Sequence, residues 1–239
     1  KKRHSEGNQI IVIVSAMSGD TDKLAEKSSL ISKNFDNQEL DVLLASGEQV
    51  SCSLLTGAII DLGLKARSWL GWQIPIITNN NHTSSKITKI KNEEISNFIS
   101  DGGIAVIAGF QGISTGNRIT TLGRGGSDLS AVAIAKFFKT DSCEIYTDVE
   151  GVLTTDPSIN EKAKKIDKIS YEEMLEMASL GAKVVQPYAV QASMIDNIPI
   201  YVKSTFSEKP GTKIIPESEI DYQKVVTGIA YSKGNAKVS

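Results

Sequence analysis

The sequence contains few cysteines and histidines, and this scarcity excludes several kinds of site. Its 239 residues include two cysteines, Cys52 and Cys143, and two histidines, His4 and His82. The cysteines lie far apart without CxxC spacing, and the histidines are equally isolated along the chain. A disulfide scaffold, a zinc site and a Ser-His-Asp triad are therefore poor interpretations, and a reducing, cytoplasmic location is the default expectation.

The sequence also lacks a strong excess of charge and a long apolar run. Its 26 Lys and Arg residues against 28 Asp and Glu residues leave a net charge of −2, so neither nucleic acid nor a membrane is an expected partner. The basic start "KKRH" is expected to be a frayed, solvated end. No apolar run is long enough to cross a bilayer, and "IIVIVSAM" is too short and too β-branched for a signal peptide.

What the chain does contain is an alternation of strand-like and helix-like segments, with 40% hydrophobic residues to form one sizeable core. Strands are expected at 9–16, 65–70, 73–79, 103–110, 143–148 and 198–204, and helices at 21–32, 39–63, 92–101, after Asp128 and after the capping box of Ser170 and Glu173. The apolar first strand should be buried on both faces. This order predicts an α/β fold, a three-layer α/β/α sandwich with a mainly parallel central sheet.

A glycine-rich turn runs directly into an apolar segment in "TTLGRGGSDLSAVAIA", residues 120–135. Gly123, Gly125 and Gly126 allow positive φ and close approach to a ligand, and Ser127 and Asp128 are good N-cap residues for the helix that follows. The free N–H groups of a helix start form an anion site. A tight connection alone would explain any one glycine, but an arginine between the glycines, Arg124, needs an anionic partner.

The helix behind this turn is apolar all round, so it should be buried and hold the turn rigidly. Nucleotide binding is a natural interpretation of such a turn. However, the chain contains neither GxxxxGK[ST] nor GxGxxG, which excludes the Walker loop and the Rossmann fingerprint. The anion site should therefore belong to another nucleotide-binding design.

Four segments together resemble the catalytic domain of aspartate kinases, within the amino acid kinase superfamily. They are "ASGEQVS", "GFQGISTGNRITTLGRGGSDLSAVAIA", "CEIYTDVEGVLTTDP" and "ISYEEMLEMASLGAKVV". The resemblance runs from about Ile10 to the end. It implies transfer of the ATP γ-phosphoryl, with Mg²⁺, to the side-chain carboxylate of L-aspartate, for lysine, threonine and methionine synthesis. That carboxylate is already anionic at pH 7, so the reaction needs positioning and charge neutralisation rather than a histidine base.

The resemblance implies an aspartate site made of residues from separate segments. Arg124 would bind the substrate carboxylate and Glu48 the substrate ammonium, while Phe110 and Ser15 would line the same pocket beside Gly125 and Gly126. Glu48 could instead be an ordinary carboxylate on a helix surface, although its small and apolar neighbours in "LLASGEQVS" disfavour that interpretation.

The resemblance also implies catalytic and nucleotide-binding residues. Ser127 and Asp128 would lie beside the transferring phosphoryl group, and Thr147, Asp148 and Leu153 would contact the nucleotide. Lys183 would reach the ATP phosphates or the ribose, although a lone lysine is more often solvated. Asp148 could also serve as a turn residue before the next glycine. Purely structural roles are expected for Met174, Met177, Trp69 and Trp72.

Departures from the family pattern cluster on the nucleotide side. The chain shows no KFGGTS-type first strand, Ser158 stands where the family usually has arginine, and Leu153 where a tyrosine is common. We therefore expect a kinase domain at 1–217, truncated at its start and a poor catalyst alone, followed at 218–239 by a strand leading toward absent ACT domains. The alternative is a degenerate, inactive amino-acid-binding remnant of such an enzyme. A third and weaker interpretation is a related kinase that acts on another substrate, such as glutamate 5-kinase or uridylate kinase. A homodimer is possible.

Overall fold

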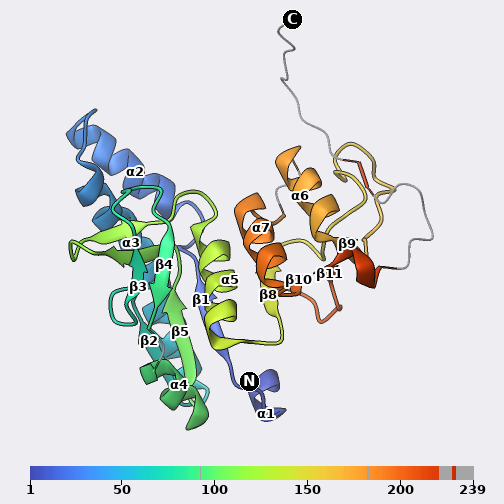
Figure 1. Ribbon diagram of the computed structural model, residues 1–239, viewed down its shortest axis with the longest axis horizontal. Helices are drawn as coiled ribbons and strands as arrows, with labels where there is room; N and C mark the ends of the chain where they lie inside the picture. Colours follow the sequence, from blue (N-terminus) through green and yellow to red (C-terminus); the bar gives the residue numbers. More distant parts are fainter. Residues whose placement is uncertain (92, 182–183, 221–227, 230–239) are drawn as a thin grey trace, which may run out of the picture. The chain divides into compact units, whose positions relative to one another are not determined.

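A computed structural model describes residues 1–91, 93–181, 184–220 and 228–229. The chain forms two compact units, Lys1–Phe138 and Lys139–Ser239, which run from blue to yellow-green and from yellow to red in Figure 1. Five of the eight pairings between described strands are parallel. Helices flank these sheets, so the predicted α/β class with mainly parallel sheets is confirmed.

Unit 1 contains a three-stranded parallel sheet in the order β1-β5-β2. The central strand β5 (Ile104–Ala108) is buried along its whole length, and it pairs with β1 (Ile11–Val14) and β2 (Ala66–Trp69). The four residues of β1 are each only partly buried. The expectation that this strand is buried on both faces was wrong, because β1 is an edge strand of its sheet and β5 takes the central position.

A second sheet of unit 1 follows the order β4-β3-β6-β7. Its strands are β3 (Ile76–Thr78), β4 (Ile87–Ile90), β6 (Gln111–Ser114) and β7 (Ile119–Thr121), and only β3 and β6 run parallel among these pairs. The sequence pattern predicted β3 but not the other three. β6 and β7 form a hairpin that precedes the glycine-rich turn. The three strands were missed because three or four residues are too few to show a clear alternation of polar and apolar side chains.

The helices of unit 1 follow the predicted order. They are α2 (Asp20–Ile31), α3 (Asn37–Asp61), α4 (Glu93–Ser100) and α5 (Gly126–Phe138). Asp36 caps α3 by accepting hydrogen bonds from the backbone N–H groups of Gln38 and Glu39. The basic start forms a single turn, α1 (Lys2–Ser5), and His4 Nε2 lies 3.0 Å from the carbonyl oxygen of Gly102. This end is therefore helical and bonded to unit 1 rather than frayed, but it is solvent-exposed as expected, since α1 has no buried residue.

By length and composition alone, helix α3 is long and apolar enough to cross a membrane, so the expectation that no apolar segment has this length was wrong. Asp41 and Glu48 interrupt its apolar sequence, and both side chains are buried together with Ala45, Cys52 and Thr56. Helix α3 contacts β2, β5 and β7. It thus packs against both sheets of unit 1 and carries two acidic groups among its buried residues.

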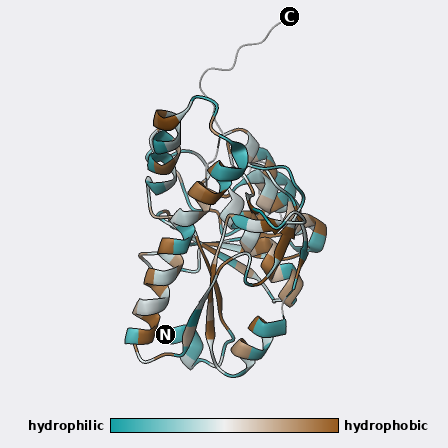
Figure 2. Cartoon of the chain, turned by 90° about the vertical axis from the view of Figure 1, so that its left-hand side faces the viewer, coloured by the Kyte–Doolittle hydropathy of each residue, from teal (hydrophilic) through white to brown (hydrophobic). Residues whose placement is uncertain are grey.

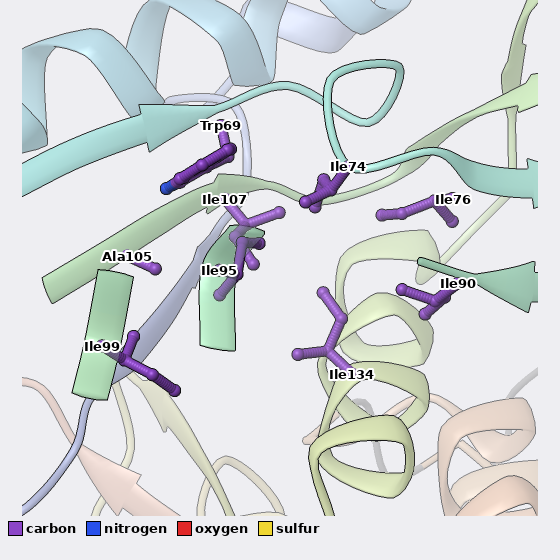
Figure 3. Close-up of a cluster of buried hydrophobic side chains, with 9 residues drawn as sticks. All are labelled: Trp69, Ile74, Ile76, Ile90, Ile95, Ile99, Ala105, Ile107 and Ile134. Atoms are coloured by element: carbon purple, nitrogen blue, oxygen red, sulfur yellow. The ribbon is translucent and has the colours of Figure 1, made fainter. Parts of the chain in front are cut away.

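The core of unit 1 is a cluster of nine buried residues, which Figure 3 shows between the sheets and the helices α4 and α5. They are Trp69, Ile74, Ile76, Ile90, Ile95, Ile99, Ala105, Ile107 and Ile134. Figure 2 shows brown strands between helices that carry both polar and apolar residues. Trp69 is a core residue as expected, whereas Trp72 is 46% exposed and lies outside the core. No sequence periodicity distinguishes these two tryptophans, which are only three residues apart.

Unit 2 has a sheet in the order β8-β10-β11-β9. The strands are β8 (Cys143–Thr147), β9 (Lys168–Ser170), β10 (Ile200–Ser204) and β11 (Thr212–Ile215). Its helices are α6 (Tyr171–Ser179) and α7 (Pro187–Asp196), and a 3₁₀ turn covers Glu217–Glu219. The predicted capping box at the start of α6 and the buried Met174 and Met177 are confirmed. β9, β11 and α7 were not predicted. The predicted segment 218–239 lies largely outside the described residues.

Candidate functional site

The carboxyl ends of two parallel strands meet the start of a helix in unit 1. The N–H of Gly109, just after β5, donates to the carbonyl oxygen of Val14 at the end of β1 (3.0 Å). A Cβ atom on Gly109 would lie 3.1 Å from the Cα atom of Ser127 in the first turn of α5. Ligands of open α/β sheets bind outside the carboxyl ends of the strands. This junction is therefore the candidate site.

Glu48 points from α3 to the segment that follows β1. The N–H of Ala16 donates to Glu48 Oε1 (3.0 Å), and a Cβ atom on Gly47 would lie 2.9 Å from the Cβ atom of Ala16. Glu48 is only 4% exposed, so the interpretation as a surface carboxylate is excluded. Ser15, the chain neighbour of Ala16, is exposed.

The second carboxylate oxygen of Glu48 has no hydrogen-bond partner among the described residues, although it is buried. Burial raises the pKa of Glu48 to about 6, and the hydrogen bond from the Ala16 N–H lowers it only in part. A buried carboxylate oxygen without a donor is costly. The arrangement therefore favours a cationic ligand with N–H donors at this oxygen.

The glycine-rich turn presents Arg124 to solvent. Gly123 and Gly125 on either side have φ of +76° and +73°, as predicted, and the Arg124 side chain is exposed. No hydrogen bond or ion pair joins this side chain to any other residue that the structure describes. The guanidinium is thus available for an anionic ligand.

Gly126 is a glycine for a different reason than predicted. Its φ is not positive, but a Cβ atom there would lie 2.6 Å from Cδ2 of Phe110 and 3.0 Å from Cβ of Leu122. Only a residue without a side chain allows Phe110 to pack directly on the start of α5. The predicted freedom of the backbone is therefore wrong at Gly126, and close packing replaces it.

Helix α5 also begins earlier than expected. Its first residue is Gly126, and the N–H of Leu129 donates to the carbonyl oxygen of Gly125 (3.2 Å). Gly125 therefore occupies the N-cap position, and the assignment of Ser127 and Asp128 as caps was wrong. Both lie in the first turn, where an acidic side chain such as Asp128 interacts favourably with the helix dipole. The left-handed backbone of Gly125 sets this start.

Phe110 is held in a left-handed conformation with φ of +64°. Its N–H donates to Ser130 Oγ (3.0 Å), and its carbonyl oxygen accepts from the N–H of Leu122 (2.9 Å). A left-handed non-glycine residue costs about 1–3 kcal/mol and persists where its surroundings hold it. These bonds place Phe110 between the end of β5 and the start of α5, next to the glycine-rich turn.

A buried polar network in unit 1 was not predicted from the sequence. Asp41 on α3 is fully buried and accepts hydrogen bonds from His82, Thr83 and Thr121. His82 is isolated in the sequence because its partner, Asp41, lies 41 residues away. One signal was available, since Asp41 precedes Glu48 by two helical turns and so shares its face of α3.

In unit 2, Thr147 and Asp148 lie at the carboxyl end of β8. Thr147 Oγ1 donates to Asp148 Oδ1 (3.0 Å), and the carbonyl oxygen of Thr147 accepts from the N–H of Thr205 (2.8 Å). Leu153 pairs with Lys165 in a β-bridge. Asp148 is exposed, as the turn interpretation allows. Lys183 lies outside the described residues, so its role stays a prediction.

Known proteins of one family are similar to this chain. The model of the "Amino acid kinase family" matches residues 1–204. An aspartate kinase from Stutzerimonas stutzeri is 46% identical over 100% of this chain and 58% of its own length. Aspartokinase 2 from Bacillus subtilis is 44% identical over 98% of this chain and 57% of its own length. The chain thus spans less than two thirds of the length of these curated relatives.

Solved structures show the same fold. Aspartate kinase from Synechocystis matches 90% of this chain and 36% of its own with a TM-score of 0.79 and 43% identity. E. coli aspartokinase III in complex with aspartate and ADP matches 91% of this chain and 61% of its own, with a TM-score of 0.78 and 23% identity. Together with the family match over most of its length, these likenesses show that the chain belongs to the amino acid kinase family and has its three-layer α/β/α fold.

Proposed function

We propose that this chain is the catalytic part of an aspartate kinase, which transfers the γ-phosphoryl group of ATP to the side-chain carboxylate of L-aspartate. The observation that carries the proposal is Glu48, a buried carboxylate beside the segment that follows β1, with one oxygen that has no donor among the residues the structure describes. The relatives named aspartate kinase, at 44–46% identity, support the same assignment. The product is 4-phospho-L-aspartate, an intermediate for lysine, threonine and methionine, and we place the reaction in the cytoplasm.

L-Aspartate carries one ammonium group and two carboxylates, and unit 1 offers a complement to both charges. Glu48 would accept hydrogen bonds from the ammonium group, and Arg124 would bind a carboxylate through its two parallel N–H donors. Phe110 and Ser15 would limit the pocket, and Gly125 and Gly126 would let the substrate approach the backbone. This pairing of charges selects an amino acid over a simple dicarboxylic acid.

The reaction itself needs no protein base. The side-chain carboxylate of aspartate is ionised at pH 7, so one of its oxygens attacks the γ-phosphorus as the bond to the ADP oxygen breaks. Ser127 and Asp128 would lie beside the transferring group, where the N–H groups of the α5 start stabilise negative charge. Thr147, Asp148 and Leu153 in unit 2 would contact the nucleotide, and Lys183 its phosphates or ribose.

Mg²⁺ would arrive with ATP rather than occupy a protein cage. Mg²⁺ is usually held by one or two carboxylates together with substrate phosphates. The described residues contain no cluster of three histidine, cysteine or acidic side chains that could hold a metal alone. We therefore treat Mg²⁺ as part of the MgATP substrate. A homodimer without nucleic-acid or membrane partners completes the proposal.

One observation favours a second candidate, an amino-acid-binding remnant without activity. Ser158 stands where the family usually has arginine, and its N–H and hydroxyl both bond Asp156 Oδ1 (2.8 and 2.7 Å) in a local turn. A cation is thus replaced by a turn residue on the nucleotide side. Aspartate binding is common to both candidates, whereas turnover belongs to the kinase alone.

The test is a hydroxylamine trap for the acyl phosphate, with the chain expressed together with any sequence that its reading frame encodes on either side. MgATP is combined with L-aspartate, L-glutamate or succinate, which lacks the ammonium group. We expect turnover with aspartate and at least about 100-fold less with succinate, because the buried Glu48 oxygen then lacks its donor. Glu48→Gln should lose most of this preference.

The matched control is Glu39→Gln, which changes an exposed carboxylate on the same helix and should keep the preference for aspartate. Calorimetric binding of aspartate without any turnover would favour the inactive remnant. Equal turnover of aspartate and succinate by the unchanged protein would refute the role of Glu48.

A further inference from the structure

The Asp41 carboxylate gathers three donors from two separate segments of unit 1. Its Oδ1 accepts from Thr121 Oγ1 (2.5 Å) and the N–H of Thr83 (3.0 Å), and its Oδ2 lies 2.6 Å from His82 Nδ1 and 3.1 Å from the backbone nitrogen of Thr83. Asp41 is 0% and Thr121 1% exposed. Both oxygens are therefore engaged, and this buried charge is compensated within the protein. We name Asp41, His82, Thr83 and Thr121 the Asp41 latch.

The latch holds the segment 79–85 against the end of β7. Besides the contacts to Asp41, the N–H of Ser85 donates to the carbonyl oxygen of Thr121 (2.9 Å). Thr83 has φ of +65°, an unusual conformation for a β-branched residue. Such a conformation persists only where the surroundings impose it. The bond from its N–H to Asp41 is the constraint seen here.

The same segment touches the glycine-rich turn. A Cβ atom on Gly123 would lie 3.2 Å from the carbonyl oxygen of Thr83 and 3.6 Å from the Cα atom of Ser84. Thr83 thus contacts Asp41 through its N–H and faces Gly123 through its carbonyl group. Thr121 is linked to the turn along the chain, since it stands three residues before Arg124.

We propose that the Asp41 latch positions Arg124: Asp41, His82 and Thr121 fix the two segments that meet the Gly123–Gly125 turn and so set where the guanidinium lies. Arg124 has no protein partner of its own among the described residues, so its position depends on the turn beneath it. The latch residues act through Arg124 and do not touch the substrate. The identity of the ligand rests on the proposed function, whereas the latch itself rests on these contacts.

The test pairs a disruptive and a conservative variant at each donor. Thr121→Val and His82→Ala remove a donor, whereas Thr121→Ser keeps the hydroxyl and His82→Asn keeps an N–H near the position of Nδ1. We expect the disruptive variants to raise both Kd and KM for aspartate about tenfold and KM for MgATP less than about twofold, because binding is lost on one substrate only. The conservative variants should recover to within about threefold of the unchanged protein.

Arg118→Gln is the matched control. It breaks the ion pair between Arg118 and Glu39, which also links the β6–β7 hairpin to α3 but lies on the surface. This variant should leave aspartate binding unchanged. A lower Tm for Thr121→Val and His82→Ala with unchanged aspartate Kd would reduce the latch to a structural element and overturn the inference.

Two further measurements keep the possible outcomes distinct. If Arg124→Ala leaves aspartate binding intact, the proposed aspartate site fails; if it weakens binding and the latch variants do not, only the latch fails. Hydrogen exchange of the Gly123–Gly126 amides, which needs no ligand, should be at least about tenfold faster in Thr121→Val than in Thr121→Ser. Should His82→Ala not fold, the two Thr121 variants decide; equal exchange rates in them would contradict the proposal.

Discussion

Asp41 and Glu48 lie seven residues apart on the same buried face of α3, yet their carboxylates have opposite surroundings. Asp41 receives hydrogen bonds on both oxygens, whereas Glu48 receives one bond on Oε1 and has a buried Oε2 without a partner among the described residues. The Asp41 carboxylate therefore stabilises the fold around it, whereas the Glu48 carboxylate can still accept a hydrogen bond from a ligand. Helix α3 thus carries both the residue proposed to bind the ammonium group, Glu48, and the residue proposed to position the Arg124 turn, Asp41.

The first prediction concerns pH and the free energy of unfolding. The pKa of Glu48 is raised to about 6 from 4.5, so the folded state binds more protons than the unfolded state between these values. The stability from this residue is full below about pH 4.5 and is lost as pH rises through about 6. The difference between the two pKa values corresponds to a loss of about 2 kcal/mol in the free energy of unfolding.

Urea unfolding of the unchanged protein and of Glu48→Gln checks this prediction. The stability of Glu48→Gln relative to the unchanged protein should rise by up to about 2 kcal/mol between pH of about 4.5 and 7.5. Contributions from the other carboxylates cancel in this difference. Stability curves that stay parallel over the interval would show that burial does not perturb Glu48.

The second prediction concerns Arg124. Arg124→Ala should weaken aspartate binding by about 2 kcal/mol, the loss of a charge-assisted contact. Arg124→Lys should recover only part of this loss, because lysine keeps the charge but not the paired N–H donors. Isothermal calorimetry measures both variants, and an aspartate affinity equal to that of the unchanged protein in Arg124→Ala would remove the residue from the site.

The third prediction compares two glycines in helices. Gly126→Ala places a methyl group 2.6 Å from Phe110 Cδ2, and the forced shift should cost about 1–3 kcal/mol of stability and weaken aspartate binding. Gly57 in α3 is exposed, and a methyl group added there would meet no atom within 4 Å apart from its chain neighbours and the adjacent backbone of its own helix. Gly57→Ala should therefore stabilise the protein by about 0.5–1 kcal/mol. Denaturant unfolding measures the stability of both variants, as a shift of the midpoint at an unchanged m-value. Equal changes in stability for Gly126→Ala and Gly57→Ala would contradict the packing argument.

The fourth prediction concerns the capping box of α6. Ser170 Oγ accepts from the N–H of Glu173, and Glu173 Oε2 accepts from the N–H of Ser170, both at 3.1 Å. Ser170→Ala should cost about 1 kcal/mol, whereas Ser170→Thr keeps a capping hydroxyl and should cost less. Thermal unfolding measures both variants. The affinity for aspartate should stay unchanged, because Glu48 and Arg124 belong to unit 1 and Ser170 to unit 2. A weaker affinity for aspartate in either variant would contradict the prediction.

The long elements could be predicted from the sequence and the short ones could not. α3 and β5 extend far enough for apolar patterning and length to identify them, and the start of α6 shows both partners of its capping box. β4, β6 and β7 have three or four residues each, with polar side chains among them. Their conformation depends on the strands with which they pair, and local sequence does not specify those partners.

Contiguous motifs were enough to predict the family and the glycine-rich turn around Arg124, whereas the aspartate site proposed from them stays a prediction. The folded chain was needed to show that Glu48 is buried with a raised pKa, that Gly126 serves packing against Phe110, and that His82 bonds Asp41. Each of these features depends on atoms brought together from distant parts of the chain. Burial and hydrogen-bond partners set the energy of a charged group, and both arise only when the chain has folded.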